Sequence, residues 1–387
     1  MLLRALDAPR RLPAEIDLAL LWSTLILLLI GMVMVYSASM ATAEAARVTG
    51  NQPAYFLVRH AVFLTIGLLA AAVAFQVPLS TWQQWSPWLF VAGFLLLALV
   101  LVPGIGREVN GARRWLPLGI VTLQPSELMK FFAVLYTADY TARKMTHMHD
   151  LKRAFLPMAF AMVAVGVLLL KEPDFGAFVV IIAVSIAILF LGGMRARLFV
   201  VLIVVLIAAF AALIILSPYR RDRIFGFMDP WADAFGRGYQ LSHALIAFGR
   251  GELFGVGLGA SVEKLFYLPE AHTDFLLAVI AEELGFVGVL VVIVLFGLLV
   301  QRAFAIGRQA VALDRLYSAL VAQGIGVWLG VQGFINMGVN TGLLPTKGLT
   351  LPLMSFGGSG ILANCVAVAV LLRIDWENRQ LMRGAKV

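Results

Sequence analysis

Long apolar runs alternate with short polar segments along almost the whole of this 387-residue chain. A helix needs about 20 residues to cross the hydrocarbon core of a bilayer, so each apolar run near that length predicts a membrane-spanning helix. The runs lie at 16–36, 56–75, 88–102, 126–140, 155–170, 176–191, 198–216, 275–300, 317–339 and 358–374. The pattern predicts an all-α polytopic membrane protein, a bundle of about ten transmembrane helices.

The composition agrees with this fold class. Hydrophobic residues make up 61% of the chain and charged residues only 13%, which leaves too little polar surface for an ordinary soluble domain. Residues 16–374 are therefore expected to form one membrane domain, flanked by tails at 1–15 and 375–387 that are too short to fold alone. The single cysteine, Cys365, excludes an intrachain disulfide.

Lysine and arginine indicate the orientation. The net charge of +8 comes from short clusters between the apolar runs, which is a topology signal and not a nucleic-acid-binding face. Most of these residues face the cytoplasm when both termini are placed there, and the long loop at 218–273 then lies outside. Arg107, Arg113 and Arg114 break this bias on the outer side, which indicates either an anionic partner or a local pair with Glu108. The neighbouring Trp115 suits the membrane interface, and guanidinium groups suit phosphate oxygens.

The polar segment that ends at Asp274 is the one long interruption of the apolar pattern, and it precedes the eighth run. It opens with several arginines and continues through a glycine-rich stretch at 248–259. Apolar residues between 238 and 249 fit one side of a helix lying in the membrane interface. The Thr273–Asp274 pair resembles a helix start, so the Asp274 carboxylate either caps that helix or acts as a general base. Its place at the bilayer surface, beneath the arginines, favours the second role.

Ionisable side chains inside spanning segments cost about 3 kcal/mol or more each on insertion scales, so they are functional candidates. Glu127 and Lys130 fall on one helix face as a possible ion pair, which either only fixes helix packing or contributes to a substrate site. Glu282 and Glu283 are about 100° apart around their helix, so they cannot share one face. We expect them to play a structural role, pairing with an arginine or capping a neighbour. Asp174 lies at another outer helix end and is expected to extend the same polar rim.

The segment at 340–360 is too apolar for a free loop and too rich in proline and glycine for a helix. It predicts a re-entrant segment, which is tolerated only where protein or a cavity covers it. Gly357 and Gly358 open the next helix, where backbone N–H groups can bind a phosphate together with Lys347 and Ser355. Close packing of helices is the alternative role for the glycines. The histidines have no second ligand at metal-binding spacing, so no metal cage of side chains is predicted.

Six short motifs carry a resemblance to a known family. They are GARRW at 111–115, QPSE at 124–127 with Lys130, EPD at 172–174, LPEAHTDF at 268–275, AEELG at 281–285, and LPTKGLTLP at 344–352 followed by GGSG at 357–360. In this order they resemble the SEDS family (shape, elongation, division and sporulation) over nearly the whole chain. The PTKG form of the last motif favours the family's cell-division member over its elongation member.

The resemblance implies a peptidoglycan glycosyltransferase that polymerises lipid II at the division septum, on the outer face of the bacterial cytoplasmic (inner) membrane. It implies a class B penicillin-binding protein as septal transpeptidase partner, other membrane proteins of the division machinery and membrane lipid, with no nucleic acid. Asp274 matches the family's essential aspartate. Glu127, Lys130 and Trp115 match positions of its cavity.

An inverting transfer between two lipid-linked sugars fits these side chains. It needs a base for the acceptor's sugar hydroxyl and positive charge for the undecaprenyl diphosphate, which leaves as an anion and so needs no glycosidase-type acid. We expect Asp274 to be the base. Lys130, Arg113 and Arg114, with a hydrated divalent cation such as Mg²⁺ or Mn²⁺, are expected to share the diphosphate charge.

Two other functions stay open. A lipid II flippase or another transporter also combines intramembrane charges with a broken helix, and a non-catalytic scaffold for division proteins would need none of this chemistry. The candidate groups cluster at the outer ends of helices, whereas alternating access prefers groups buried midway. This placement disfavours the transporter.

Overall fold

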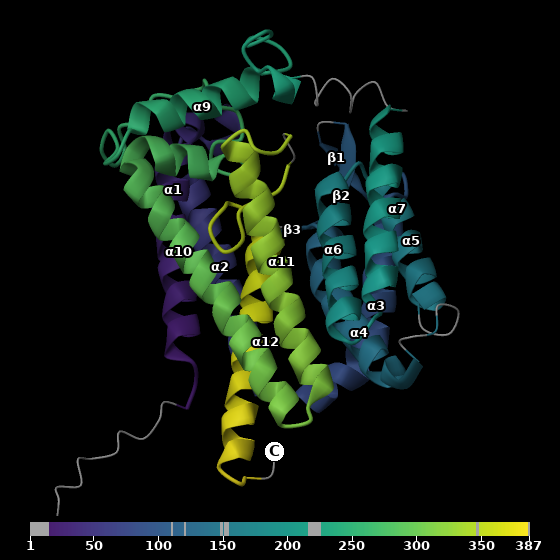
Figure 1. The fold of residues 1–387 in the computed structure, drawn as a ribbon. Coiled ribbons are helices and arrows are strands. Elements are labelled where there is room, and N and C mark those ends of the chain that lie inside the picture. The colour runs from purple at the N-terminus through teal and green to yellow at the C-terminus, as the bar shows by residue number, and fades with distance from the viewer. Residues whose placement is uncertain are drawn as a thin grey trace, which may run out of the picture.

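The chain folds into a bundle of long helices, shown in the computed structural model of Figure 1. The structure describes residues 15–109, 111–119, 121–147, 150, 155–215, 226–345 and 348–385. Within these residues each predicted run has its helix. The helices are α1 (Leu18–Ala45), α2 (Tyr55–Gln76), α3 (Leu79–Val100), α4 (Pro125–Lys144), α5 (Leu156–Lys171), α6 (Phe175–Leu191), α7 (Ala196–Ile215), α10 (Leu276–Ala312), α11 (Leu316–Asn340) and α12 (Gly358–Met382). The predicted fold class is confirmed.

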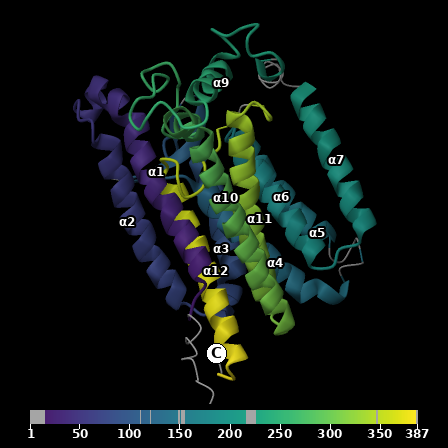
Figure 2. The same cartoon turned by 60° about the vertical axis from the view of Figure 1, so that its left-hand side comes forward.

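Six of these helices are long and apolar enough to cross a membrane, namely α1, α2, α3, α10, α11 and α12. Helices α5, α6 and α7 are apolar over shorter described lengths, and α4 carries charges such as Glu127 and Lys130. Helices α4, α5 and α6 run with the other six in both views, and α7 lies at the edge of the bundle (Figures 1 and 2). Large apolar side chains point outward, for example Trp88 at 76% and Phe160 at 78% exposure. Such a surface is the one expected to contact lipid.

Several helices extend beyond their apolar runs. Helix α3 begins at Leu79, well before the predicted start at 88, while α10 reaches Ala312 and α12 reaches Met382. Polar side chains in these extensions are satisfied across the bundle, since Gln83 of α3 donates a hydrogen bond of 3.1 Å to Asp139 of α4. Apolar length alone therefore underestimates helices whose ends leave the hydrocarbon region.

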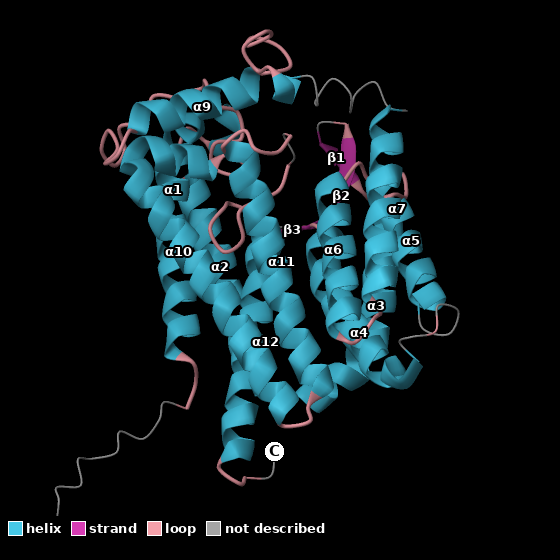
Figure 3. Cartoon of the chain, in the orientation of Figure 1, coloured by secondary structure: helices cyan, strands magenta, loops and turns pink. Residues whose placement is uncertain are grey.

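A small antiparallel sheet follows α3, and the sequence pattern did not predict it. Strands β1 (Arg107–Val109), β2 (Ala112–Leu118) and β3 (Val121–Leu123) pair in that order (Figure 3). Glu108 stands opposite Arg113 in the register of β1 and β2. The strands are short and partly charged, so they lack the alternating apolar pattern that indicates a half-buried strand.

The long loop contains α9 (Tyr239–Gly251), which lies across one end of the bundle and packs on α10 (Figures 1 and 2). The helix expected at 238–249 is therefore confirmed. After α9, the backbone of residues 252–257 forms hydrogen bonds of 2.9–3.1 Å with the carbonyls at 282–283 and the N–H groups at 286–287 of α10.

Helix α10 is interrupted at Gly285, whose φ of 68° and ψ of −166° are not helical. The bonds from residues 252–257 supply partners for the backbone groups that this interruption leaves without helical ones. A β-carbon on Gly255 of the loop would lie 2.2 Å from the carbonyl oxygen of Glu283, so this close approach requires glycine. The loop is thereby fixed to the first segment of α10, the segment that Asp274 precedes.

The segment between α11 and α12 turns back into the bundle, as predicted, and is drawn in yellow beside α11 in Figure 1. Its side chains Leu351, Leu353 and Met354 are at most 1% exposed. A β-carbon on Gly31, in the middle of α1, would lie 2.6 Å from the Met354 backbone. The described part of this re-entrant segment is thus covered by protein, as irregular backbone at membrane depth requires.

Candidate active site

Asp274 is half-buried and lies directly before α10, at the end of the bundle where α9 packs on that helix. Helix α10 begins at Leu276 with Phe275 as its N-cap residue, so the helix start predicted at Thr273–Asp274 is two residues early and Asp274 is not the cap. A β-carbon on Gly348 would lie 3.1 Å from Asp274 Oδ2. The carboxylate therefore faces the re-entrant segment.

Two asparagines of α11 hold the backbone at Asp274. Nδ2 of Asn336 and Nδ2 of Asn340 donate hydrogen bonds of 2.8 and 3.0 Å to its carbonyl oxygen. Asn336 Nδ2 also donates to the Leu349 carbonyl at 2.6 Å, and Asn340 Oδ1 accepts from the Ala278 N–H at 3.1 Å. Both asparagines are at most 2% exposed. Asp274 is thus tied to α11, to the first turn of α10 and to the re-entrant segment.

His272 provides a second link to the re-entrant segment. Its carbonyl accepts a 3.0 Å hydrogen bond from the N–H of Phe356, and its ring lies 4.5 Å from the ring of Phe56 between centroids. Burial lowers the pKa of His272 below its usual range, although Glu270 opposes this shift. The imidazole is therefore uncharged at neutral pH and supplies no cation beside Asp274.

Glu127 and Lys130 form the predicted ion pair inside the bundle. Lys130 Nζ lies 2.8 Å from Glu127 Oε1, donates to Gln332 Oε1 at 2.7 Å and lies 5.7 Å from the Trp328 ring centre. The two charged side chains are 1% and 9% exposed, lysine first. Glu127 Oε2 has no hydrogen-bond partner among the described residues, and a β-carbon on Gly360 would lie 3.2 Å from it. This buried oxygen therefore keeps an unused acceptor site inside the bundle.

One face of α11 joins the two charged groups. Gln332, Asn336 and Asn340 are four residues apart, so they share that face. The first contacts Lys130 and the other two contact Asp274. Eight residues of α-helix span about 12 Å, so base and ammonium are held within roughly two helical turns along the axis. The sequence analysis assigned no role to these three amides. Their spacing of four residues was the available signal, with Gln332 and Asn336 inside an apolar run and Asn340 directly after it.

The arginines of the GARRW motif lie in the sheet. Arg113 forms the local pair with Glu108, at 2.9 Å, that was one of the two alternatives for this cluster. Arg114 donates to the backbone carbonyls of residues 172–173, and Trp115 is half-buried opposite Arg107. Among the described residues, these bonds lead from Arg113 to β1 and from Arg114 to the turn at 172–173, and not directly to α11.

Asp174 connects the start of α6 with the start of α4. Its Oδ1 accepts from the N–H of Ala177 at 3.1 Å, as an N-cap does. Its Oδ2 accepts from Ser126 Oγ at 2.7 Å and from Gln124 Nε2 at 3.2 Å. Both carboxylate oxygens are engaged within the protein, which favours the supporting role predicted for this residue.

Glu172, the first residue of the EPD motif, is a buried acid to which the sequence analysis assigned no role of its own. It is 0% exposed, and neither carboxyl oxygen has a hydrogen-bond partner among the described residues. Burial, with a contribution from Asp174, raises the pKa of Glu172 from 4.5 to about 9, although Arg114 opposes the shift. The side chain is therefore a neutral carboxylic acid at neutral pH.

This raised pKa predicts a pH-dependent stability. Between pH 4.5 and about pH 9, Glu172 keeps its proton in the folded chain and loses it in the unfolded chain. The free energy of unfolding therefore falls as the pH rises through this range. We expect the melting temperature of the wild type to fall more than that of Glu172→Gln between about pH 6 and pH 8. Thermal unfolding in detergent at both pH values measures this. Glu44→Gln, which removes an exposed carboxylate, is the control, and equal slopes for all three proteins would contradict the assignment.

Glu282 and Glu283 anchor the long loop to α10. Glu282 accepts from Arg250 at 2.7 Å, and Glu283 accepts from Lys264 at 2.6 Å and from Ser37 Oγ at 2.7 Å. Both glutamates are at most 1% exposed. These contacts, which include pairing with an arginine, favour a structural role for the two residues.

Of the residues expected to bind phosphate near the start of α12, Ser355 and Gly358 have contacts within the protein. Ser355 Oγ accepts a backbone N–H at 2.9 Å and closes a turn of the re-entrant segment. A β-carbon on Gly358 would lie 2.6 Å from the Phe63 ring, which favours the packing interpretation for this glycine, whereas Gly357 precedes it in extended backbone. Lys347 lies outside the described residues, and so do the arginines that open the long loop.

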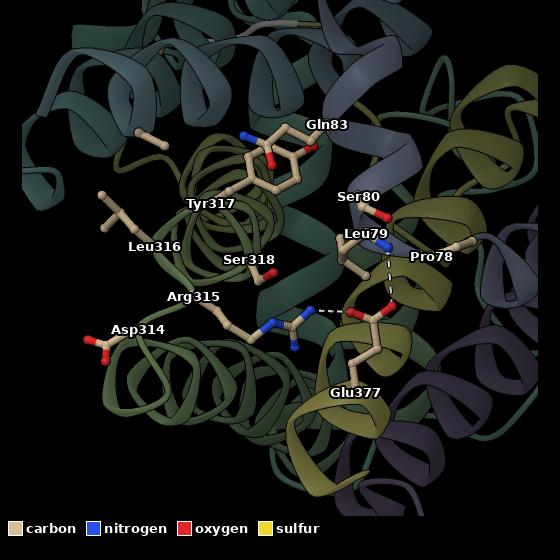
Figure 4. Close-up of a pocket in the computed structure, with 11 residues that line it drawn as sticks. Pro78, Leu79, Ser80, Gln83, Asp314, Arg315, Leu316, Tyr317, Ser318 and Glu377 are labelled. Atoms are coloured by element: carbon tan, nitrogen blue, oxygen red, sulfur yellow. Dashed lines mark hydrogen bonds and ion pairs between the residues drawn. The ribbon is translucent and has the colours of Figure 1, made fainter. Parts of the chain in front are cut away.

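A cavity of about 420 Å³ lies at the other end of the bundle, between the ends of α3, α11 and α12 (Figure 4). Glu377 in its wall accepts from Arg315 and, at 3.1 Å, from the N–H of Leu79. The turn that follows α10 contributes to this wall, whereas Asp274 precedes the same helix. The cavity is therefore separate from the candidate active site.

Sequence comparison gives a consistent result. The sequence model of a family described as cell cycle protein, labelled FtsW, RodA and SpoVE, matches residues 18–380. The probable peptidoglycan glycosyltransferase FtsW of Aromatoleum aromaticum is 67% identical over 383 residues, covering 99% of this chain and 92% of that relative.

Solved structures share the fold. A chain from a study of how a peptidoglycan synthase complex coordinates polymerization and crosslinking matches with a TM-score of 0.75 and 31% identity, covering 94% of this chain and 99% of that chain. The rod shape determining protein RodA of Thermus thermophilus matches with a TM-score of 0.68 and 29% identity, covering 96% and 99%. The resemblance seen in the motifs is thus confirmed over nearly the whole chain. The chain belongs to the FtsW, RodA and SpoVE family of cell cycle proteins, and within it is most similar to FtsW.

Proposed function

We propose that this chain is a peptidoglycan glycosyltransferase that polymerises lipid II. The observation that carries the proposal is that one face of α11 holds both the backbone of Asp274 and the ammonium group of Lys130. A candidate base and a candidate anion-stabilising group are thereby part of one site. The relatives named peptidoglycan glycosyltransferase, and the similar chain from a peptidoglycan synthase complex, support the substrate class.

In the proposed reaction, Asp274 removes a proton from the attacking hydroxyl of the acceptor sugar. That oxygen forms the new bond to the anomeric carbon of the donor from the face opposite the diphosphate, so the configuration inverts. The bond between this carbon and the diphosphate oxygen breaks, and undecaprenyl diphosphate leaves with the electron pair. Because the leaving group is an anion that needs no proton, one carboxylate is sufficient.

Lys130 is proposed to stabilise the charge that develops on the diphosphate. Its ammonium group is buried, and a charge in a water-poor site acts on a neighbouring anion more strongly than a charge in bulk water. Arg113 and Arg114 are proposed to contribute from the sheet. The pair between Arg113 and Glu108 is exposed, and exposed pairs contribute little, so exchanging Glu108 for a phosphate oxygen costs little.

A divalent cation is not assigned to this chain's side chains. Among the described residues, no group of three or more His, Cys, Asp or Glu side chains could hold a metal ion. The proposed steps involve Asp274 and the cationic side chains, and a hydrated divalent cation that shares the diphosphate charge stays part of the proposal.

We place the reaction at the outer face of the bacterial cytoplasmic membrane, at the division septum, with both termini in the cytoplasm. The start of α1 and the end of α12 lie at the same end of the bundle, away from α9 (Figure 1). The distribution of lysine and arginine supports this orientation. A class B penicillin-binding protein is the proposed partner, supported by the synthase complex that couples polymerization and crosslinking.

The test is reconstitution of the purified chain with its proposed partner and lipid II in detergent. We expect glycan strands, resolved by gel electrophoresis, from the complex and none from the partner alone. A protein that is folded and monodisperse yet makes no strands would contradict the proposal. Lipid scrambling in vesicles without polymerisation would instead support the transporter.

A further inference from the structure

Three amide side chains, those of Gln332, Asn336 and Asn340, line one face of α11. None of the motifs that carry the family resemblance contains Asn336 or Asn340. We propose that Asn336 and Asn340 are positioning residues, which fix the backbone of Asp274 so that its carboxylate keeps one place relative to the re-entrant segment and to Lys130. This inference rests on the proposed function. It adds that the geometry of the base is set from α11, a helix that does not carry the base.

Hydrogen bonds occupy both acceptor positions of the Asp274 carbonyl oxygen. A carbonyl oxygen has two lone pairs, and here both accept, one from Asn336 Nδ2 and one from Asn340 Nδ2. The two hydrogens of the Asn336 amide are both used, on Asp274 and on Leu349. Because these partners are carbonyl oxygens, which only accept, the amide nitrogen must face them. The peptide that follows Asp274 is therefore held in one orientation.

The same amides also fix what the carboxylate faces. Asn336 binds the carbonyl of Leu349, and the carboxylate of Asp274 faces the preceding residue, Gly348. Gln332, one turn away on the same face, binds Lys130 and the carbonyl of Thr350. The base, the segment opposite it and the ammonium group thus share one support. Displacement of a catalytic group by about 1 Å can cost about 100-fold in rate, so loss of this support should reduce turnover.

Asn340 allows the positioning role to be separated from a structural one. Its oxygen accepts from the Ala278 N–H near the start of α10, while its nitrogen donates to Asp274. Asn340→Asp keeps an oxygen for Ala278 and places a carboxylate at a helix N-terminus, where it is favourable. It removes the donor to the Asp274 carbonyl and to the Asn336 carbonyl, and it places an oxygen against both. A residue that matters only as a cap should tolerate this change, and a positioning residue should not.

We expect Asn340→Asp to lower kcat for polymerisation by roughly 10- to 100-fold. The KM for lipid II should stay within about twofold, because substrate contacts are unchanged. Because Asn340 is fully buried, the new carboxylate should lower the melting temperature, so kcat is measured per folded molecule. Asn336→Ala, which removes the donor to both carbonyls, should lower kcat in the same way. The control is Thr341→Val, which removes a hydroxyl that bonds only within α11, to Met337 and Gly338, and should leave kcat unchanged.

Wild-type kcat in both folded asparagine variants would overturn the inference. A loss of activity that is no larger than the loss of folded protein would overturn it too. The proposed function is tested separately by the wild type and by Asp274→Asn. If the wild type polymerises lipid II and Asp274→Asn does not, the function stands whatever the asparagine variants do. Hydrogen exchange gives a readout that needs no substrate, since removing the donors should speed exchange at residues 348–350. Unchanged exchange in variants with reduced kcat would also contradict the positioning role.

Discussion

Asp274→Asn is expected to lower the rate of glycan polymerisation by roughly 100- to 10,000-fold, the range that a general base contributes. Asparagine has the same shape but cannot take the proton from the acceptor hydroxyl. The hydrogen bonds from Asn336 and Asn340 go to the backbone carbonyl of residue 274, so they survive the change. Loss of activity should therefore occur without loss of folding, which distinguishes a chemical role from a structural one.

The measurement is strand formation from lipid II per folded molecule, with the partner protein present. Asp233→Asn is the matched control, because it removes an exposed carboxylate from the same long loop by the same isosteric change. We expect the control to polymerise at the wild-type rate. A folded Asp274→Asn protein that polymerises as fast as the control would show that Asp274 is not the base.

The membrane bundle was predictable because bilayer thickness dictates the length of an apolar run, whatever the neighbouring helices are. The re-entrant segment was predictable for a related reason. Its prolines and glycines exclude a regular helix, and its apolar character excludes a free loop, so only a covered segment satisfied both conditions. Leu353 and Met354, both 0% exposed, show that coverage.

Other features depend on contacts between distant segments and leave little local signal. Gly285 lies in an apolar run and breaks α10 only because residues 252–257 supply hydrogen bonds to the break. The sheet at β1 to β3 depends on backbone pairing between short, partly charged strands. Glu172 reads as a surface charge, and only the folded chain shows that it is fully buried.

The sequence predicted the charged side chains of the candidate site but not the asparagines that support them. Asp274, Glu127 and Lys130 stood out because an ionisable group in a spanning segment is costly and must have a reason. An uncharged amide costs less than a charge in a spanning segment, so Asn336 did not stand out inside its apolar run, nor did Asn340 directly after that run. Their role became visible only once α11, α10 and the re-entrant segment were placed together. The spacing of polar residues within spanning helices is therefore a useful signal besides their charge.

Lys130→Met is expected to reduce polymerisation by roughly 100- to 1,000-fold, the effect of removing one donor that stabilises developing negative charge. The single variant also leaves the Glu127 carboxylate without its cation in a site where its side chain is 9% exposed. Breaking a buried pair in this way costs about 3–5 kcal/mol of stability. Loss of activity in the single variant alone would therefore be ambiguous.

The double variant Glu127→Gln with Lys130→Met resolves the ambiguity, because it removes both charges and leaves no unpaired carboxylate. Replacing a buried pair by neutral groups is often close to neutral for stability, so the double variant should melt near the wild type and still be inactive. Glu127→Gln alone measures what the carboxylate contributes. Asp375→Asn with Arg379→Gln neutralises another ion pair, on α12 near the opposite end of the bundle, and should leave turnover unchanged. A stable double variant at residues 127 and 130 with wild-type turnover would show that Lys130 only packs α4 against α11.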